Sequence, residues 1–102
     1  MKKRVFLVHG WGGNPDNHWF PWLRKNLEEK GYWVVSLSMP NPKNPMIGAW
    51  VSFLSKQIKD VNKNTYIVGH SIGCQAIMRY LEKLSDKSKI GGIIFVAGFF
   101  NL

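Results

Sequence analysis

The segment with the clearest chemistry reads Gly-His-Ser-Ile-Gly over residues 69–73. An apolar run from Thr65 to Val68 precedes it and a helical pattern follows it, which predicts a sharp strand-to-helix turn at Ser71. Gly69 and Gly73 have no side chains, so neighbouring backbones can approach the turn closely. The N–H groups and positive dipole end of the helix would stabilise an oxyanion beside the serine. We therefore predict that Ser71 is a catalytic nucleophile; a plain helix cap is the alternative.

A second glycine-rich segment, His9 to Gly13, follows the first apolar run. Where a serine sits on a strand-to-helix turn, one oxyanion donor is the backbone N–H that follows it, and another comes from the loop after an earlier strand. These donors are predicted to be Ile72 and either Gly10 or Trp11. The segment matches neither a phosphate-binding P-loop nor a dinucleotide fingerprint. An ordinary flexible turn is the alternative.

Each of the three histidines precedes the Ser71 hydroxyl or adjoins it. His9 ends the first predicted strand and is expected to order the loop. His18 begins the first predicted helix near the pocket and is expected to be solvated or capping. His70 is adjacent to Ser71 on a sharp turn, so its side chain should diverge and serve a structural role. Without a base, Ser71 would be a weak nucleophile.

Strands and helices that alternate along the chain must position these residues. The patterns indicate strands at Val5–Val8, Tyr32–Leu37, Thr65–Val68 and Gly92–Ala97, and helices at Trp19–Lys30, Met46–Asp60 and Ile72–Leu84. This alternation predicts one α/β domain over residues 1–102, with three α/β/α layers and a parallel sheet. We predict the strand order second, first, third, fourth. Both glycine-rich segments then lie at the switch point between the first and third strands.

Composition favours a packed globular chain. Apolar residues make up 45% of the 102 residues, and no run approaches the ~20 residues of a membrane helix. The basic start at residues 1–4 is followed by too short an apolar run for a signal peptide, so we predict a cytoplasmic protein without a membrane partner. The single cysteine, Cys74, has no disulfide partner within the chain, in keeping with a reducing compartment. It is expected to be a small buried residue, the alternative being a thiol whose pKa the helix start lowers.

The formal net charge is +8, which raises the question of nucleic acid. The lysines scatter along predicted helix surfaces and form no dense cluster with interleaved aromatic residues. Nucleic-acid binding is therefore the weaker interpretation. The sequence also has no carboxylate pair and no Cys/His metal spacing, so no cofactor or metal is expected.

Taken together, the motifs resemble those of the small serine hydrolases typified by retinoblastoma-binding protein nine. The shared features are His9-Gly10, Trp19, Trp22-Leu23, Met39-Pro40-x-Pro42, Trp50 and Gly69-His70-Ser71-x-Gly73. This family has an α/β-hydrolase fold without a large lid. The resemblance implies esterase-type activity on small acyl esters and a truncated α/β-hydrolase fold for this chain.

The resemblance also exposes what this chain lacks. The family would place its acid after a fifth strand and its histidine after a sixth, both later in the chain than the serine. After Ser71 the only acids are Glu82 and Asp86, and Glu82 lies roughly 15 Å along the helix. We therefore predict that the chain is a fragment or has little activity alone. A non-catalytic binding domain that keeps the hydrolase fold is the alternative.

The fourth predicted strand, with Ile93 to Ala97, reads as buried on both faces. In a chain of this length it would form a bare sheet edge, and Phe99 and Phe100 would have little to pack against. Unpaired apolar edges promote association. We therefore predict a homodimer or poor solubility through this edge.

Overall fold

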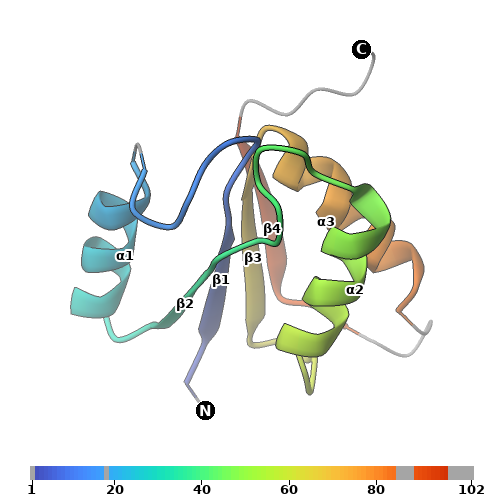
Figure 1. Ribbon diagram of the computed structural model, residues 1–102. Helices are drawn as coiled ribbons and strands as arrows, with labels where there is room; N and C mark the ends of the chain where they lie inside the picture. Colours follow the sequence, from blue (N-terminus) through green and yellow to red (C-terminus); the bar gives the residue numbers. More distant parts are fainter. Residues whose placement is uncertain (1, 18, 85–88, 97–102) are drawn as a thin grey trace.

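The computed structural model describes residues 2–17, 19–84 and 89–96. Four strands alternate with three helices in the predicted order (Figure 1). The elements are β1 (Arg4–Val8), α1 (Phe20–Glu29), β2 (Trp33–Leu37), α2 (Ile47–Gln57), β3 (Thr65–His70), α3 (Ile72–Glu82) and β4 (Gly92–Val96). Among these described helices, none is long and apolar enough to cross a membrane.

All strand pairs are parallel, and the order is β2-β1-β3-β4, as predicted. Val8 at the end of β1 lies opposite Gly69 of β3, and His70 lies opposite Val96 of β4. The carboxyl ends of the three strands therefore meet at one edge of the sheet. This register brings the His9–Gly10 segment next to Ser71.

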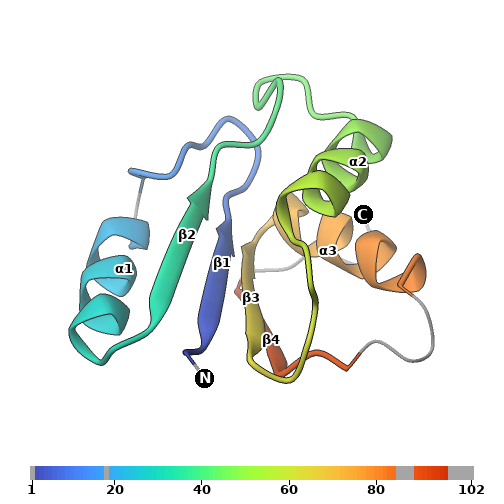
Figure 2. The ribbon, with the colours of Figure 1, turned by 90° about the horizontal axis from the view of Figure 1, so that it is seen from below.

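Helices cover both faces of the sheet, which confirms the three-layer α/β architecture. α1 lies on one face, whereas α2 and α3 lie side by side on the other (Figures 1 and 2). The larger core, between the sheet and the helix pair, includes Phe6, Trp50 and Ile77. The smaller core, beneath α1, includes Val5 and Phe20.

The ends of the helices follow local backbone chemistry. Pro21 occupies the first turn of α1, where its missing N–H costs nothing, and Gly31 follows with φ 92°, a value that favours glycine. α2 ends at Gln57, three residues before the predicted Asp60, because Ile58 is already extended. Asp60 itself adopts φ 54° in the following turn.

β4 forms an edge of the sheet, as predicted for a chain of this length, and it is not buried on both faces. Ile93 packs against the larger core, but Ile94 on the opposite face is 61% exposed and Phe95 is 38% exposed. The reason is that α1 packs beside β2 and β1, so β4 has a helix layer on one face only. The predicted strand end Ala97, together with Phe99 and Phe100, lies outside the described residues.

Candidate active site

Ser71 forms the junction between β3 and α3. Its φ of 55° and ψ of −125° lie in a region that non-glycine residues rarely adopt, and such a conformation costs on the order of 1–3 kcal/mol. The turn is held by hydrogen bonds from the Ser71 N–H to the Val96 carbonyl and from the Cys74 N–H to the Ser71 carbonyl, both 3.0 Å. The Ser71 side chain makes no capping hydrogen bond to α3, which argues against a plain helix cap.

Two glycines allow the β1 loop to touch the start of α3. A Cβ on Gly73 would lie 2.7 Å from the His9 carbonyl oxygen and 3.0 Å from that of Val8. A Cβ on Gly10 would lie 3.0 Å from the Cβ of Ser71. Real Cβ atoms do not approach backbone oxygens as closely as 2.7 Å. The close packing around Ser71 therefore depends on glycine at both positions.

Gly69 serves a similar purpose on the core side of the turn. A Cβ at this position would lie 2.5 Å from Cδ1 of Ile77 and 3.4 Å from the backbone of Cys74. The nearest atom belongs to the end of a flexible side chain. Gly69 therefore tolerates substitution better than Gly73, which faces rigid backbone.

A small cavity of about 70 Å³ lies at the carboxyl ends of β1 and β3. It has room for only a few water molecules. Its lining comprises His9, Gly10, Trp11, Gly13, Asn17, Phe20, His70 and Ser71. The structure thus brings together the predicted serine, the glycine-rich loop and two of the three histidines, with Ile72 directly following Ser71 at the start of α3.

His9 is buried, and its two ring nitrogens are engaged by backbone groups. The Met39 N–H donates to Nε2 at 2.9 Å, so the proton is on Nδ1, which donates to the Gly10 carbonyl oxygen at 2.9 Å. The ring also packs edge-on against Trp50, with centroids 5.7 Å apart. Burial lowers the pKa of His9, which favours the neutral ring. His9 therefore joins the β1 loop to the segment after β2.

His70 packs against the beginning of α1. Its ring meets those of Trp19 and Phe20 edge-on, with centroids 5.5 and 6.2 Å away. These contacts attach the start of α1 to the end of β3 and turn the imidazole toward the aromatic pair. The third histidine, His18, lies outside the described residues.

Within the described residues, the cavity at Ser71 has no carboxylate in its lining. Glu82 is exposed at the far end of α3, and Asp86 lies outside the described residues. Within the described ranges, no group of three or more His, Cys, Asp or Glu side chains could hold a metal ion.

Cys74 is a buried core residue, as predicted. Burial raises the pKa of its thiol, and this effect outweighs the backbone hydrogen bonds at Val96 and at Cys74 itself, which lower it. The alternative of a thiol activated by the helix start is therefore wrong. The reason is that Cys74 points into the packed interior, where the thiolate would lose its hydration.

Sequence reasoning missed two residues of the cavity wall, Asn17 and Phe20. Asn17 closes a turn in which the Asn14 N–H donates to its Oδ1 at 2.9 Å, and the run Asn-Pro-Asp-Asn at residues 14–17 is a recognisable turn signal. Phe20 begins α1 and is almost completely buried. The pair of adjacent aromatic residues, Trp19 and Phe20, could have indicated that the start of this helix faces the interior.

Comparison with known proteins places this geometry in context. A family model described as serine hydrolase matches residues 5–101. The Bacillus subtilis (strain 168) protein named "Putative hydrolase YdeN" is 46% identical over 99 residues, which cover 97% of this chain and 52% of that protein. The serine hydrolase RBBP9 of Rattus norvegicus is 34% identical over 82 residues, covering 78% of this chain and 44% of that protein.

The fold agrees with a solved structure as well. The crystal structure of the ydeN gene product from B. subtilis superimposes with a TM-score of 0.91 at 45% sequence identity, covering 96% of this chain and 53% of the other. This chain therefore spans about half the length of the relatives that it matches. The family match extends over nearly all of the chain, and it agrees with the parallel sheet and the helix order. The chain belongs to the serine hydrolase family.

Proposed function

We propose that this chain supplies the nucleophile half of a serine hydrolase that acts on small acyl esters, with Ser71 as the nucleophile. The observation that supports this most strongly is the positive φ of Ser71 at a strand-to-helix turn that lines a cavity with Gly10 and Trp11. Strained backbone of this kind persists where the surrounding packing enforces it and is concentrated at active sites.

In the proposed reaction, Ser71 Oγ attacks the acyl carbonyl carbon, and its proton passes to a general base. The negative charge moves to the carbonyl oxygen, which accepts hydrogen bonds from the Ile72 N–H and from the N–H of Gly10 or Trp11. The positive end of the α3 dipole adds to this stabilisation. The base returns the proton to the alcohol oxygen as that bond breaks, which leaves an acyl-serine. The same base then takes a proton from water, whose oxygen attacks the acyl carbon, and the proton passes to Ser71 Oγ as the acid is released.

The general base and its acid are proposed to lie in the part of the fold that the relatives have and this chain does not match. His9 is a poor candidate because backbone groups engage its two nitrogens. His70 packs against the aromatic pair of α1. The isolated chain should therefore bind and polarise an ester weakly but turn it over slowly. A cytoplasmic location stays a prediction, based on Cys74 having no disulfide partner in the chain.

A chimera tests the proposal. In it, this chain is followed by the half of the B. subtilis relative that the chain does not match, and hydrolysis of p-nitrophenyl acetate is measured. Turnover of at least ~1 s⁻¹ is expected, with a loss of about 10³-fold or more in Ser71→Ala. Ser52→Ala, an exposed serine on α2, is the matched control and should leave turnover unchanged.

The isolated 102-residue chain is the comparison for the chimera in the same assay. It should show only trace hydrolysis, which Ser71→Ala lowers less than about twofold, because an unactivated hydroxyl contributes little. Enzyme-like turnover by the isolated chain that depends on Ser71 would place the base within these 102 residues and refute this account. A folded chimera without Ser71-dependent turnover would favour the alternative, a non-catalytic binding domain.

A further inference from the structure

The loop after β1 and the loop after β2 lie side by side at the carboxyl ends of their strands (Figures 1 and 2). Each loop contains a tight turn. In the first, which we call the glycine turn (residues 10–13), the Gly13 N–H donates to the Gly10 carbonyl oxygen at 3.1 Å. In the second, the proline turn (residues 41–44), the Asn44 N–H donates to the Asn41 carbonyl oxygen at 3.0 Å. The glycine turn contains both proposed oxyanion donors, Gly10 and Trp11.

Two hydrogen bonds join these turns through their central residues. The Gly12 N–H donates to the Pro42 carbonyl oxygen at 2.7 Å, and the Trp11 indole Nε1–H donates to the Lys43 carbonyl oxygen at 3.0 Å. The first bond alone would leave the glycine turn free to rotate about it. The second bond starts from a different residue and ends on a different carbonyl, so the pair fixes the orientation of one turn relative to the other.

The proline turn is stiff and is anchored in the core. Pro42 occupies the second position of its turn, which proline favours because its φ is already set. On the interior side, the Trp50 indole donates to the Pro40 carbonyl oxygen at 2.7 Å, and the Met39 N–H donates to Nε2 of His9 at 2.9 Å. Trp50 and His9 are both almost completely buried. The proline turn therefore holds the glycine turn at a position that the packed interior determines.

We propose that the proline turn is the positioning element of the oxyanion hole, and that the Trp11 side chain is the group through which it acts. The inference rests on the proposed function of Ser71. The bond from the Trp11 indole to the Lys43 carbonyl oxygen orients the backbone of the glycine turn, so that its donor N–H faces the ester carbonyl oxygen together with that of Ile72. Donors that are fixed in advance stabilise the developing negative charge without reorganising during the reaction.

The exposure of Trp11 separates this role from a purely structural one. The side chain is 68% exposed, so its ring buries little apolar surface and should contribute little to the stability of the fold. Its N–H nevertheless bonds a backbone carbonyl 32 positions away in the chain. Trp22 on α1 offers a comparison, because it is 66% exposed and its indole makes no hydrogen bond to another described residue.

The test compares steady-state hydrolysis of p-nitrophenyl acetate by the chimera and by its Trp11→Phe variant, which keeps an aromatic ring and removes the N–H. An oxyanion hole acts in the transition state, so kcat should fall while KM stays within about twofold. We expect kcat to fall about 10-fold, less than the roughly 100-fold or more that follows complete loss of an oxyanion donor, because the backbone donor is still present. Trp22→Phe is the matched control and should leave both constants unchanged.

A second variant approaches the same contact from the other turn. Pro42→Gly leaves the glycine turn intact and removes the constraint on φ in the proline turn, so kcat should fall about 3-fold at constant KM. Because both substitutions loosen one contact, the double variant should lose less than the product of the two single losses. The midpoint of urea unfolding should move by less than about 0.5 M in Trp11→Phe. A larger shift would assign the loss of kcat to destabilisation and overturn the positioning role.

The outcomes distinguish this inference from the proposed function. A chimera without Ser71-dependent turnover would refute both. Ser71-dependent turnover with an unchanged kcat in Trp11→Phe would refute the positioning role and leave the proposed function intact. A rise in KM at constant kcat would also refute it, because Trp11 would then only bind the substrate. Losses that multiply in the double variant would do the same, since the two turns would then act independently.

Discussion

Gly73 is the position where a single methyl group should disturb the candidate site most. It is the second residue of α3, and an added Cβ would lie 2.7 Å from the His9 carbonyl oxygen and 3.0 Å from the Val8 carbonyl oxygen. Both oxygens belong to the end of β1 and the loop after it. Gly73→Ala must therefore push the loop away from α3, because the two nearest atoms are backbone oxygens and not the far end of a flexible side chain.

Gly48 provides a matched control for the magnitude. It is the second residue of α2, as Gly73 is of α3, but a Cβ there would meet nothing within 4 Å. Both substitutions gain up to about 1 kcal/mol of helix propensity. Gly73→Ala also incurs overpacking, about 2–3 kcal/mol at a rigid contact. We expect a net loss of about 1–2 kcal/mol for Gly73→Ala, equivalent to roughly 4–16 °C in Tm, and a small gain for Gly48→Ala.

Urea denaturation followed by tryptophan fluorescence would measure both variants against the unchanged chain. A difference of about 2–3 kcal/mol in the free energy of unfolding between Gly73→Ala and Gly48→Ala is the expected result. If the two variants are equally stable, the carbonyl oxygens of the β1 loop can move freely. The stability of the fold would then not depend on the close approach of this loop to Ser71.

Three further predictions concern buried groups. Burial lowers the pKa of His9, so the unfolded state binds the His9 proton more tightly than the folded state does. The contribution of His9 to the free energy of unfolding should therefore be constant above about pH 6.5 and fall below it. Urea titrations should show a weaker fall for His9→Asn, and an equal fall in the variant and the unchanged chain would contradict a buried, neutral His9. Trp50→Phe removes the indole N–H, whose nitrogen lies 2.7 Å from the Pro40 carbonyl oxygen that accepts its hydrogen bond. The substitution should lower the free energy of unfolding by about 1–3 kcal/mol, and a loss below about 0.5 kcal/mol would show that this hydrogen bond contributes little. The Cys74 thiol is buried and its pKa is raised, so a disulfide reagent should modify it slowly in the native chain and rapidly in urea; rapid native modification would show that the helix is open.

The arrangement of the sheet was predictable because its signals are local. Continuous apolar runs marked the strands, and alternation with helices implied parallel pairing with right-handed crossovers. The meeting of the Ser71 turn with Gly10 followed from the same logic, since carboxyl ends of parallel strands share one edge. These inferences needed no knowledge of distant side-chain contacts.

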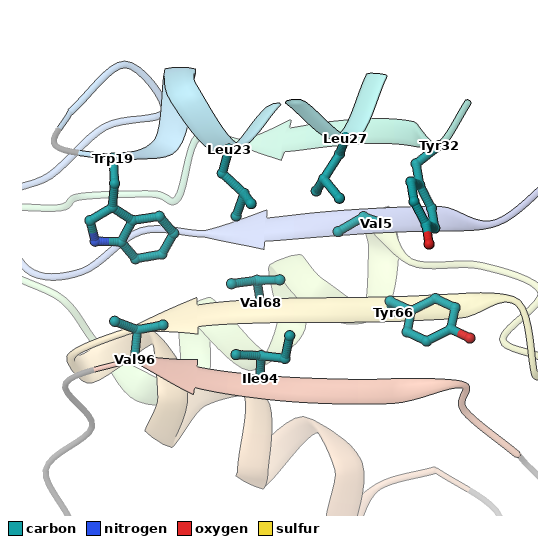
Figure 3. Close-up of a pocket in the computed structure, with 9 residues that line it drawn as sticks. All are labelled: Val5, Trp19, Leu23, Leu27, Tyr32, Tyr66, Val68, Ile94 and Val96. Carbon is teal, nitrogen blue, oxygen red and sulfur yellow. The ribbon is translucent and has the colours of Figure 1, made fainter. Parts of the chain in front are cut away.

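Burial and long-range hydrogen bonds were harder to predict. The apolar run at Ile93–Val96 shows that both faces of β4 favour burial, but not which helix reaches each face. The hydrogen bond from the Met39 N–H to His9 joins residues 30 positions apart, and no local pattern encodes it. The hollow beside α1 on the sheet, lined by Leu23, Val68 and Ile94 among others (Figure 3), could not be predicted for the same reason, because its walls come from separate elements.

The most direct test of the central claim is covalent labelling of the chimera with a fluorophosphonate, followed by mass mapping. Such a probe reacts with a serine only when a base activates it. The account predicts a single adduct on Ser71, absent from Ser71→Ala, and labelling of the isolated chain at least ~100-fold slower. A folded chimera with an unlabelled Ser71, or with its adduct on another residue, would contradict the assignment of Ser71 as the nucleophile.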